Sequence, residues 1–314
     1  MSLFITSLNS GSNGNCYYVG NDREAILVDM GLSCRETEKR LQRLGLPVDR
    51  IKAIFISHEH GDHIKGLTVF SKKYALPVYI TEPTQRNGGL NLDHLPITFK
   101  AHEPVCVGEL LITAFPKFHD AADPYSFVVA CGEIRIGVFT DIGVPCEQLI
   151  LHFQQCHAAF LEANYDEEML ENGSYPIHLK RRIRGGNGHL SNRQALDLFL
   201  AHRPTYMSHL LLSHLSHNNN NPDLVRELFI PHADGTRIII ASRYQETPVY
   251  FIGHCEVRTA TVSRTATAAS RAVMPLSHPV LAERQSALST TIPSAGPAKP
   301  RSRSTRNPNQ ISLF

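Results

Sequence analysis

The sequence predicts an α/β protein, in the α+β sense, in which two mixed β-sheets lie back to back and helices cover their outer faces as a four-layer αββα sandwich. Two observations indicate this fold. Apolar runs rich in β-branched residues come first as neighbouring strands, and further strands then alternate with helical patterns. The same succession occurs twice between residues 1 and 253. Because a segment of this length can enclose a large core, we treat 1–253 as one folded domain.

The expected strands are short runs bounded by turn residues, at 3–8, 15–20, 24–30, 51–57, 77–81, 110–115, 125–131, 134–140, 157–162, 206–213, 236–242 and 248–252. The expected helices have apolar residues at helical spacing and cover 34–44, 64–75, 146–155, 192–202 and 222–229. Ser33 and Ser191 precede two of these helices, and Glu36 and Gln194 follow three residues later. Each pair predicts a capping box, in which both side chains satisfy free N–H groups at the helix start.

Composition and charge limit the class of protein. The formal net charge is +2, so any surface that binds nucleic acid must be a local basic patch. The seven cysteines are scattered and never form a CxxC pair, which is typical of reduced thiols in the cytoplasm. The first residues show no signal sequence, and no apolar segment is long enough to cross a membrane. We therefore expect a cytoplasmic protein.

The composition changes after residue 253. Ser, Thr, Ala, Pro and Arg dominate there, aromatic residues are few, and no periodicity is visible. Such a segment buries too little apolar surface to offset the entropy that is lost on ordering. We expect 254–309 to be a disordered basic linker.

A dense group of metal-binding residue types follows the expected strand 51–57. His58-x-His60 places two imidazoles on one side of an extended turn, and Asp62-His63 adds a second pair that points elsewhere. Imidazole and carboxylate groups are ligands for zinc, manganese and iron. Two diverging pairs at this spacing favour two metal ions a few ångströms apart that share a bridging water. A solvated polar loop would not explain four potential ligands within so short a stretch.

Each metal ion needs further ligands, and the ends of other expected strands offer candidates. His119, Asp141 and His214 each follow an apolar run that is expected to be a strand. Asp141 suits a bridging position because a carboxylate has two oxygen atoms that can bind. His209 and His217 flank His214 and are alternative candidates, but the strand-end position and the HLS-x-NN pattern favour His214.

This pattern of histidines and aspartates resembles the metallo-β-lactamase-fold hydrolases. Nine stretches narrow the resemblance to exodeoxyribonucleases of the YycJ/WalJ type: SLNSGSNGN at 7–15, VDMGLS at 28–33, HEHGDHIKG at 58–66, HDAADP at 119–124, TDIG at 140–143, LEAN at 161–164, YPIHLKRRI at 175–183, GHLSN at 188–192 and HLSHNNNNP at 214–222. The similarity extends over residues 3–252. It implies the αββα fold, two divalent metal ions and an exodeoxyribonuclease activity directed to 5′ ends.

The resemblance also implies how the ligands divide. One metal ion is held by His58, His60 and His119. The other is held by Asp62, His63 and His214, and Asp141 bridges the two. Mixed nitrogen and oxygen ligands admit Zn²⁺ and Mn²⁺ alike. We expect Asp62 and Asp141 to hold the water that attacks phosphorus.

His189 is a second candidate catalytic residue. It lies in GHLSN, at the start of the expected helix 192–202. A helix start attracts phosphate through its free N–H groups and its dipole. His189 is therefore a candidate to bind the scissile phosphate or to protonate the leaving oxygen. The alternative is a surface histidine beside an ordinary helix cap.

Two further features are candidates for contact with substrate. The basic run before His189 consists of Lys180, Arg181, Arg182 and Arg184. It favours contacts with a phosphate backbone, although a solvated helix face would have the same composition. Glu162 and Asn164 end another strand, where they either orient a metal ligand or contact substrate; a buried structural carboxylate is the alternative for Glu162.

The last five residues, Gln310-Ile-Ser-Leu-Phe314, place an apolar pair at the end of a segment with no core to join. Short apolar anchors on disordered tails commonly dock into pockets of partner proteins. The pentamer resembles the QLSLF-type motif with which bacterial DNA polymerases and repair proteins bind the sliding clamp. It implies that Gln310, Leu313 and Phe314 contact a clamp, which would raise the local concentration of the protein at DNA. An accidental match is the alternative.

These features predict a dinuclear metal-dependent phosphodiesterase. The most specific prediction is a DNA exonuclease that acts from 5′ ends in DNA repair or replication. Three alternatives stay open: a hydrolase of small esters or thioesters with the same fold, an enzyme that cuts RNA precursors, and a clamp-bound adaptor with a structural metal site. The basic run and the tail argue against the first alternative. The complete ligand set argues against the third.

Overall fold

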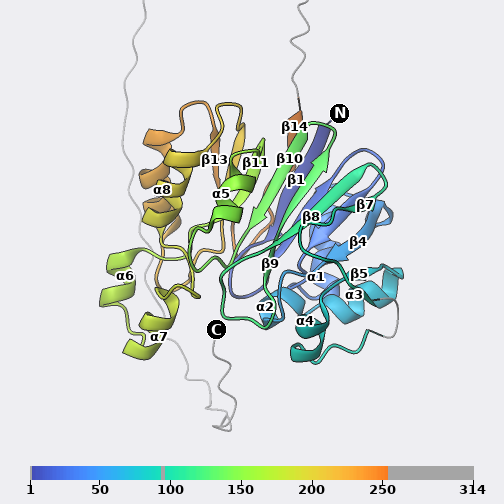
Figure 1. Cartoon of the computed structure of the whole chain (residues 1–314), viewed down its shortest axis with the longest axis horizontal. Helices are drawn as coiled ribbons and strands as arrows, with labels where there is room; N and C mark the ends of the chain where they lie inside the picture. Colours follow the sequence, from blue (N-terminus) through green and yellow to red (C-terminus); the bar gives the residue numbers. More distant parts are fainter. Residues whose placement is uncertain (1, 93–95, 254–314) are drawn as a thin grey trace, which may run out of the picture. The chain divides into compact units, whose positions relative to one another are not determined.

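The computed structural model describes residues 2–92 and 96–253, which Figure 1 shows as a coloured ribbon. The expected domain covers residues 1–253. The expected linker 254–309 and the expected clamp-binding residues Gln310, Leu313 and Phe314 lie outside the described residues. Those expectations therefore stay predictions.

Two seven-stranded mixed sheets lie at the centre of the domain, which confirms the predicted fold class. The first sheet has the strand order β14-β1-β2-β3-β4-β5-β6. Its strands are β1 (Ser2–Asn9), β2 (Cys16–Gly20), β3 (Ala25–Val28), β4 (Ile51–Phe55), β5 (Val78–Tyr79), β6 (Pro96–Ile97) and β14 (Tyr250–Gly253). Neighbours from β14 to β3 are antiparallel, and neighbours from β3 to β6 are parallel.

The second sheet repeats this arrangement, with the order β13-β12-β11-β10-β9-β8-β7. Its strands are β7 (Val105–Val107), β8 (Leu110–Pro116), β9 (Tyr125–Cys131), β10 (Ile134–Phe139), β11 (Ala158–Glu162), β12 (His209–Ser213) and β13 (Arg237–Ile240). Neighbours from β7 to β10 are antiparallel, and neighbours from β10 to β13 are parallel. Each sheet therefore has a parallel half, whose strands all end at one edge.

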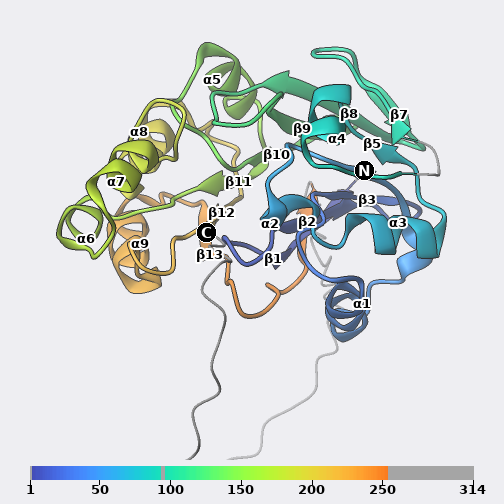
Figure 2. The ribbon, with the colours of Figure 1, turned by 90° about the horizontal axis from the view of Figure 1, so that it is seen from below.

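Helices cover the outer face of each sheet, as Figure 2 shows. Beside the first sheet lie α1 (Cys34–Arg43) and α3 (Leu67–Tyr74). The short helices α2 (Gly61–Ile64) and α4 (Glu82–Asn87) follow β4 and β5 in the chain. Beside the second sheet lie α5 (Glu147–Phe153), α8 (Asn192–His202) and α9 (Pro222–Phe229). The connection from β11 to α8 contains α6 (Glu167–Asn172) and α7 (Ile177–Ile183), and short 3₁₀ turns occur at Val48–Arg50 and Ile230–His232.

Three apolar clusters separate the four layers. Ile26 and Phe160 belong to the cluster between the sheets. Their strand neighbours Leu27 and Leu161 belong to the two outer clusters, which the helices complete. Because successive side chains of a strand point to opposite faces, strands that are buried on both faces are apolar almost throughout. This explains why continuous apolar runs, and not alternating ones, marked the strands in the sequence.

Several elements differ in extent from the expectation. The single helix expected over 64–75 is divided into α2 and α3 near Gly66. A Cβ atom at Gly66 would lie 1.7 Å from the carbonyl oxygen of Leu32, so the two backbones approach too closely for any side chain. The strand expected over 24–30 ends before Asp29, which has a positive φ of 62°. The sequence does not predict the short elements α4, α6, β6 and β7.

The two expected capping boxes have different outcomes. Ser191 Oγ accepts from Gln194 N at 3.1 Å, and Gln194 Oε1 accepts from Ser191 N at 2.9 Å, so the box at α8 is confirmed. Ser33 Oγ also accepts from Glu36 N at 3.3 Å. The Glu36 carboxylate instead binds Arg40 Nε at 3.0 Å. Only half of the second box therefore forms.

No helix within 2–92 and 96–253 combines the length and the apolar character that spanning a membrane requires. The six cysteines in this part of the chain are unpaired. Cys16, Cys131 and Cys156 each lie in a different apolar cluster, where a thiol packs as a small apolar group.

Candidate metal centre

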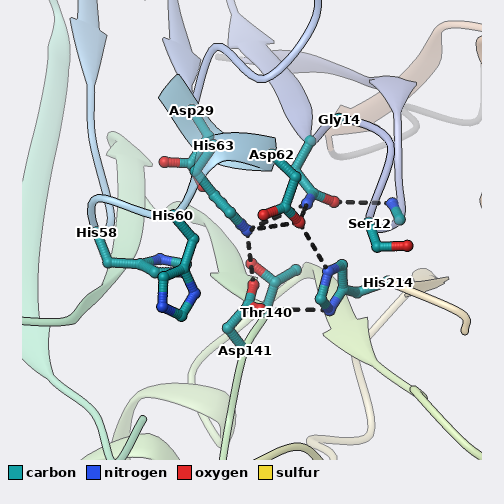
Figure 3. A network of polar contacts seen from close by, with 12 residues as sticks. Ser12, Gly14, Asp29, His58, His60, Asp62, His63, Thr140, Asp141 and His214 are labelled. Carbon is teal, nitrogen blue, oxygen red and sulfur yellow. Dashed lines mark hydrogen bonds and ion pairs between the residues drawn. The ribbon is translucent and has the colours of Figure 1, made fainter. Parts of the chain in front are cut away.

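The predicted metal-binding residues meet at the carboxyl ends of strands from both sheets. His58 follows β4, His119 follows β8, Asp141 follows β10 and His214 follows β12. Figure 3 shows side chains that point toward one another from these strand ends: His58, His60, Asp62, His63, Asp141 and His214. Their donor atoms form groups in which all atoms lie within 4.8 Å of one another.

The first donor group consists of His58, His60 and His119. His58 Nε2 lies 3.1 Å from His60 Nδ1, and His119 Nε2 lies 3.3 Å from the same atom. The His58 ring is nearly perpendicular to the other two, at 77° and 81°, so the rings do not stack and their nitrogen atoms converge. Three converging nitrogen atoms suit a tetrahedral ion that keeps one open position.

The second donor group consists of Asp62, His63 and His214. Asp62 Oδ2 lies 3.5 Å from His63 Nε2 and 3.4 Å from His214 Nε2. All three side chains are buried. This mixture of nitrogen and oxygen donors suits zinc and manganese equally.

Asp141 lies between the two donor groups. Its Oδ2 is 3.2 Å from His63 Nε2, and its Oδ1 is 3.7 Å from His119 Nε2. Oδ2 is buried, and the polar atom that faces it is His63 Nε2. A buried carboxylate costs free energy unless positive charge compensates it, and a cation between the groups would supply that charge. The converging nitrogen atoms and this buried carboxylate therefore fit a pair of divalent ions.

Protein oxygen atoms hold the opposite ring nitrogen of four histidines. The pairs are His58 Nδ1 to Ser57 Oγ (2.9 Å), His63 Nδ1 to Asp29 Oδ2 (2.7 Å), His119 Nδ1 to Gly188 O (3.0 Å) and His214 Nδ1 to Glu162 Oε1 (2.9 Å). Such contacts fix the tautomer and the ring orientation, and they leave Nε2 for a metal ion. The predicted role of Glu162 in orienting a ligand agrees with its contact to His214.

Asp29 is a residue of the centre that the sequence analysis missed. Besides its contact with His63, its carboxylate accepts from the backbone N and the Oγ of Ser57, both at 2.8 Å. It therefore orients a ligand and the start of the HEHGDH loop together. The sequence did contain a signal for Asp29. It is a polar residue at the end of an apolar strand, in VDMGLS, and Asp141 was predicted from the same kind of position.

Asn15 is also part of the centre, although the sequence analysis assigned it no role. Its Nδ2 lies 3.0 Å from Asp62 Oδ2 and 3.1 Å from His63 Nε2. Its backbone N donates to Asp62 O at 2.7 Å. The loop that contains Asn15 is thereby bound to the second donor group.

Unusual backbone conformations accompany the convergence of these side chains. Asp29, Asp141 and His214 have positive φ angles of 62°, 57° and 58°, which non-glycine residues rarely adopt. Such strain persists only where the surrounding contacts enforce it, and it is common at functional sites. Gly31 also serves the close packing, because a Cβ there would lie 1.7 Å from Asp62 O.

The two donor groups prefer different protonation states. Burial lowers the pKa of His119 to about 3 and lowers the pKa values of His58 and His60 in the same direction. These imidazoles are therefore neutral, which is the form that binds metal. Burial opposes the charge on His214 as well, but Asp141 and neighbouring carboxylates outweigh it and raise the pKa of His214 to about 10. A cation in the second group therefore has to displace a proton.

His189 lies at the rim of the centre. Its Nδ1 is 2.8 Å from Glu162 Oε1, and its ring centre is 5.2 Å from that of His119 and 5.3 Å from that of His214. The side chain is 19% exposed, so it lies between the donor groups and solvent. Burial alone would raise the pKa of Glu162, but His189 and His214 lower it to about 2. Glu162 is therefore a carboxylate that holds both imidazoles.

Two residues that were expected to contact substrate are engaged inside the protein. Asn164 is buried, and its Nδ2 donates to His214 O at 2.8 Å. Lys180 is buried as well, and its ammonium donates to Glu171 O. The contact of Asn164 with His214 agrees with the alternative that it orients a metal ligand. The placement of Lys180 corrects the expectation, because its ammonium binds the protein's own backbone.

The rest of the basic run is exposed. Arg181 and Arg182 lie on α7, and Arg184 follows it directly. Arg182 forms an ion pair with Asp120, the neighbour of His119. This pair places Arg182 beside the first donor group, whereas Arg184 pairs with Glu171 at 2.9 Å.

The two alternatives to His214 lie apart from the donor groups. His209 begins β12, and its Nδ1 contacts Ser208 Oγ at 2.9 Å. His217 is exposed, and its Nδ1 contacts the hydroxyl of Tyr244 at 3.3 Å. The strand-end criterion therefore selected the histidine that meets the other donors.

Comparisons with known proteins agree with this geometry. A family model described as the Metallo-beta-lactamase superfamily matches residues 10–150. The chain is 34% identical over 230 residues to Exodeoxyribonuclease YycJ of Bacillus anthracis, which covers 72% of this chain and 87% of that protein. It is 30% identical over 224 residues to Exodeoxyribonuclease WalJ of Streptococcus pneumoniae, which covers 69% of this chain and 83% of that protein.

A solved structure shares the fold. The metallo-beta-lactamase fold protein YhfI from Bacillus subtilis superposes with a TM-score of 0.62 at 17% sequence identity, over 80% of this chain and all (100%) of that chain. The sequence relatives and the arrangement of the two sheets lead to the same assignment. The chain belongs to the metallo-beta-lactamase superfamily, within the family that includes YycJ and WalJ.

Proposed function

We propose that the protein is a dinuclear metal-dependent phosphodiesterase that degrades DNA as an exonuclease directed to 5′ ends. The observation that carries this proposal is the pair of buried donor groups that Asp141 joins. Relatives named exodeoxyribonucleases, at 34% and 30% identity, support DNA as the substrate. The exposed arginines of the basic run, with Arg182 beside the first donor group, supply charge that suits a phosphate backbone.

The ligands of the two ions follow from the donor groups. One ion would be held by His58, His60 and His119, and the other by Asp62, His63 and His214, with Asp141 in contact with both. When bound, two divalent ions supply the acidification of a water molecule and the neutralisation of phosphate charge. The donor set fits Zn²⁺ or Mn²⁺.

The chain's own residues orient the attacking water. Asp62 Oδ2 and Asp141 Oδ2 lie 3.5 Å and 3.2 Å from the same atom, His63 Nε2. The two carboxylates therefore lie on either side of the same ring nitrogen, close enough to each other for both to accept hydrogen bonds from one water molecule. Asn15 Nδ2 fixes Asp62 Oδ2 from the other side, at 3.0 Å.

His189 is placed to move a proton at the rim. Glu162 holds its Nδ1 at 2.8 Å, so Nε2 points away from Glu162. When both ring nitrogens carry a proton, this imidazolium keeps its Nδ1–H on Glu162 and can donate the Nε2 proton to the leaving sugar oxygen, which leaves a neutral imidazole. In the same form it can instead bind the phosphate. The Glu162 carboxylate acts through His189 as a positioning group.

Replacement of Asp62 by alanine removes one ligand and one oxygen that orients water. We expect D62A to lower cleavage of end-labelled DNA at least about 100-fold with Zn²⁺ or Mn²⁺ present, with little change in the circular dichroism spectrum. The exposed Asp22, in the turn from β2 to β3, provides a matched control, and D22A should cut DNA as the wild type does. Equal cleavage by D62A and D22A would refute the role of Asp62. The same assay with matched RNA strands and with lactone and thioester substrates separates the DNA exonuclease from the other hydrolases.

The exposed arginines of the basic run are proposed to bind the DNA backbone. We expect R181Q to weaken DNA binding and to reduce the slope of log K against log salt concentration by about 0.7 to 0.9, because one phosphate is no longer neutralised. Fluorescence anisotropy across a salt series measures both quantities. Arg193 on α8 is exposed and pairs with Asp197 at 3.4 Å, so R193Q is a control with the same change in charge. A wild-type slope in R181Q would exclude this role for Arg181.

We also propose that Gln310, Leu313 and Phe314 bind a bacterial sliding clamp. The support is the similarity of the last five residues to the clamp-binding pentamer, together with a substrate that would bring both proteins to DNA. Deletion of 310–314 should abolish binding to purified clamp in surface plasmon resonance and leave cleavage of naked DNA unchanged. A chain with the same five residues in scrambled order is the control for composition. Clamp binding that survives the deletion would contradict the proposal.

A further inference from the structure

An arginine and a tyrosine with no role in the proposed chemistry lie one loop away from the metal centre. Arg243 and Tyr244 follow β13, and their segment packs on the loop 10–15. Ser10 N donates to Ser242 O at 3.2 Å, and Asn13 Nδ2 donates to Arg243 O at 2.7 Å.

The other side of the same loop contacts the second donor group. Ser10 Oγ accepts from His214 N at 2.7 Å, and Asn15 binds Asp62 Oδ2 as described above. Figure 3 shows Ser12 beside Asp62, on the side away from His58. A strand of DNA whose phosphate lies at the metal centre would therefore have its adjacent nucleotides within reach of this segment.

Tyr244 presents an aromatic ring at this position. The side chain is 69% exposed, although tyrosine is a large and mainly apolar residue. Its hydroxyl contacts His217 Nδ1 at 3.3 Å, three residues after the ligand His214. An exposed ring that is held by its polar end is a suitable platform for a nucleobase, because every base has a π-face that can stack.

Arg243 has an unused hydrogen-bond donor. Its Nη2 lies 3.3 Å from Ser12 Oγ, whereas Nη1 is buried and has no hydrogen-bond partner among the described residues. A guanidinium group carries five N–H donors in a fixed plane that matches phosphate oxygens. No carboxylate among the described residues forms an ion pair with this group, so its positive charge favours an anionic ligand near the metal centre.

Side chains of α1 bind the segment 243–246 and fix its backbone. Arg40 is buried, and its Nη2 donates to Tyr244 O at 3.1 Å. Arg43 forms a two-point ion pair with Glu246, at 2.6 Å and 2.8 Å. A platform whose backbone is fixed before binding loses little conformational freedom when a ligand arrives.

We propose that Arg243 and Tyr244 form a nucleotide subsite, in which Tyr244 stacks on an unpaired base and the charge of the Arg243 guanidinium attracts the adjacent phosphate. The identity of the ligand rests on the proposed function, which makes DNA the substrate. A base can stack on a side chain only when it leaves its pair. The subsite therefore selects single-stranded or frayed ends over closed duplex.

The test measures binding of the full chain to labelled single strands, with EDTA present so that no strand is cut. One strand is intact, and the others each carry one abasic residue at a successive position from the 5′ end. We expect the wild type to bind one abasic strand about tenfold more weakly than the intact strand. Y244L should bind the intact strand as weakly as the wild type binds that abasic strand, so that it no longer distinguishes the two. Y244F should still bind the intact strand more tightly, because it keeps the aromatic ring.

Two controls match the variants. Tyr206 is 53% exposed and lies near the opposite end of β12 from His214, so Y206L should keep the wild-type discrimination. R243Q should lower the salt dependence of binding by about 0.7, whereas R193Q should leave it unchanged. Thermal melting establishes that each variant is folded. The comparison of abasic with intact strands on the wild type tests the subsite even if a variant fails to fold.

The results test the nucleotide subsite and the exonuclease activity separately. Wild-type protein that does not distinguish abasic from intact strands at any position, or Y244L that still does, overturns the subsite. Protein that shows the expected discrimination but cuts no DNA with Zn²⁺ or Mn²⁺ supports the subsite and refutes the exonuclease. Cleavage of DNA without any discrimination refutes the subsite alone.

Discussion

The structure depends on the burial of several carboxylates and imidazoles in one place, between the carboxyl ends of strands from two sheets. Asp29, His58 and His63 are fully buried, and Asp141 is 2% exposed. Charges in such surroundings are tolerated only when other charges and hydrogen bonds compensate them. The outer ring nitrogens have protein partners, but the inner nitrogens and Asp141 Oδ2 face one another. Cations between them are the simplest compensation, and the proposed chemistry follows from it.

The fold creates this convergence through its two parallel half-sheets. The strands β3, β4, β10 and β12 end near one another. A polar residue follows β3, β10 and β12 at once, and β4 is followed by Ile56 and then by Ser57 and His58. The three positive φ angles occur at such strand ends, where the chain must turn sharply to direct a side chain inward. Rigid strands thus position the ligands, and the loop 10–15 connects them to the segment that carries Tyr244.

The sequence predicted the layers and the seven residues whose donor atoms the fold brings together, because both leave local signals. A buried strand is a continuous apolar run, and a ligand at its end is a polar residue that interrupts this run. Contacts between distant segments leave no such signal. Asn15 reaches Asp62 across 47 positions, and Asp29 reaches His63 across 34, so neither partnership can be recognised from spacing. Lys180 was misjudged for a similar reason, since only the fold brings the carbonyl of Glu171 to its ammonium. Strands of two or three residues, such as β6 and β7, are too short to produce a period.

Anomalous X-ray diffraction from crystals grown with Mn²⁺ or Zn²⁺ tests the central claim most directly, because it locates each ion independently of activity. The account predicts two ions per chain, about 3.5 to 4 Å apart. One should be bound by His58, His60 and His119, the other by Asp62, His63 and His214, and Asp141 should contact both. A single ion, or two ions bound at other residues while these side chains stay without metal, would contradict it.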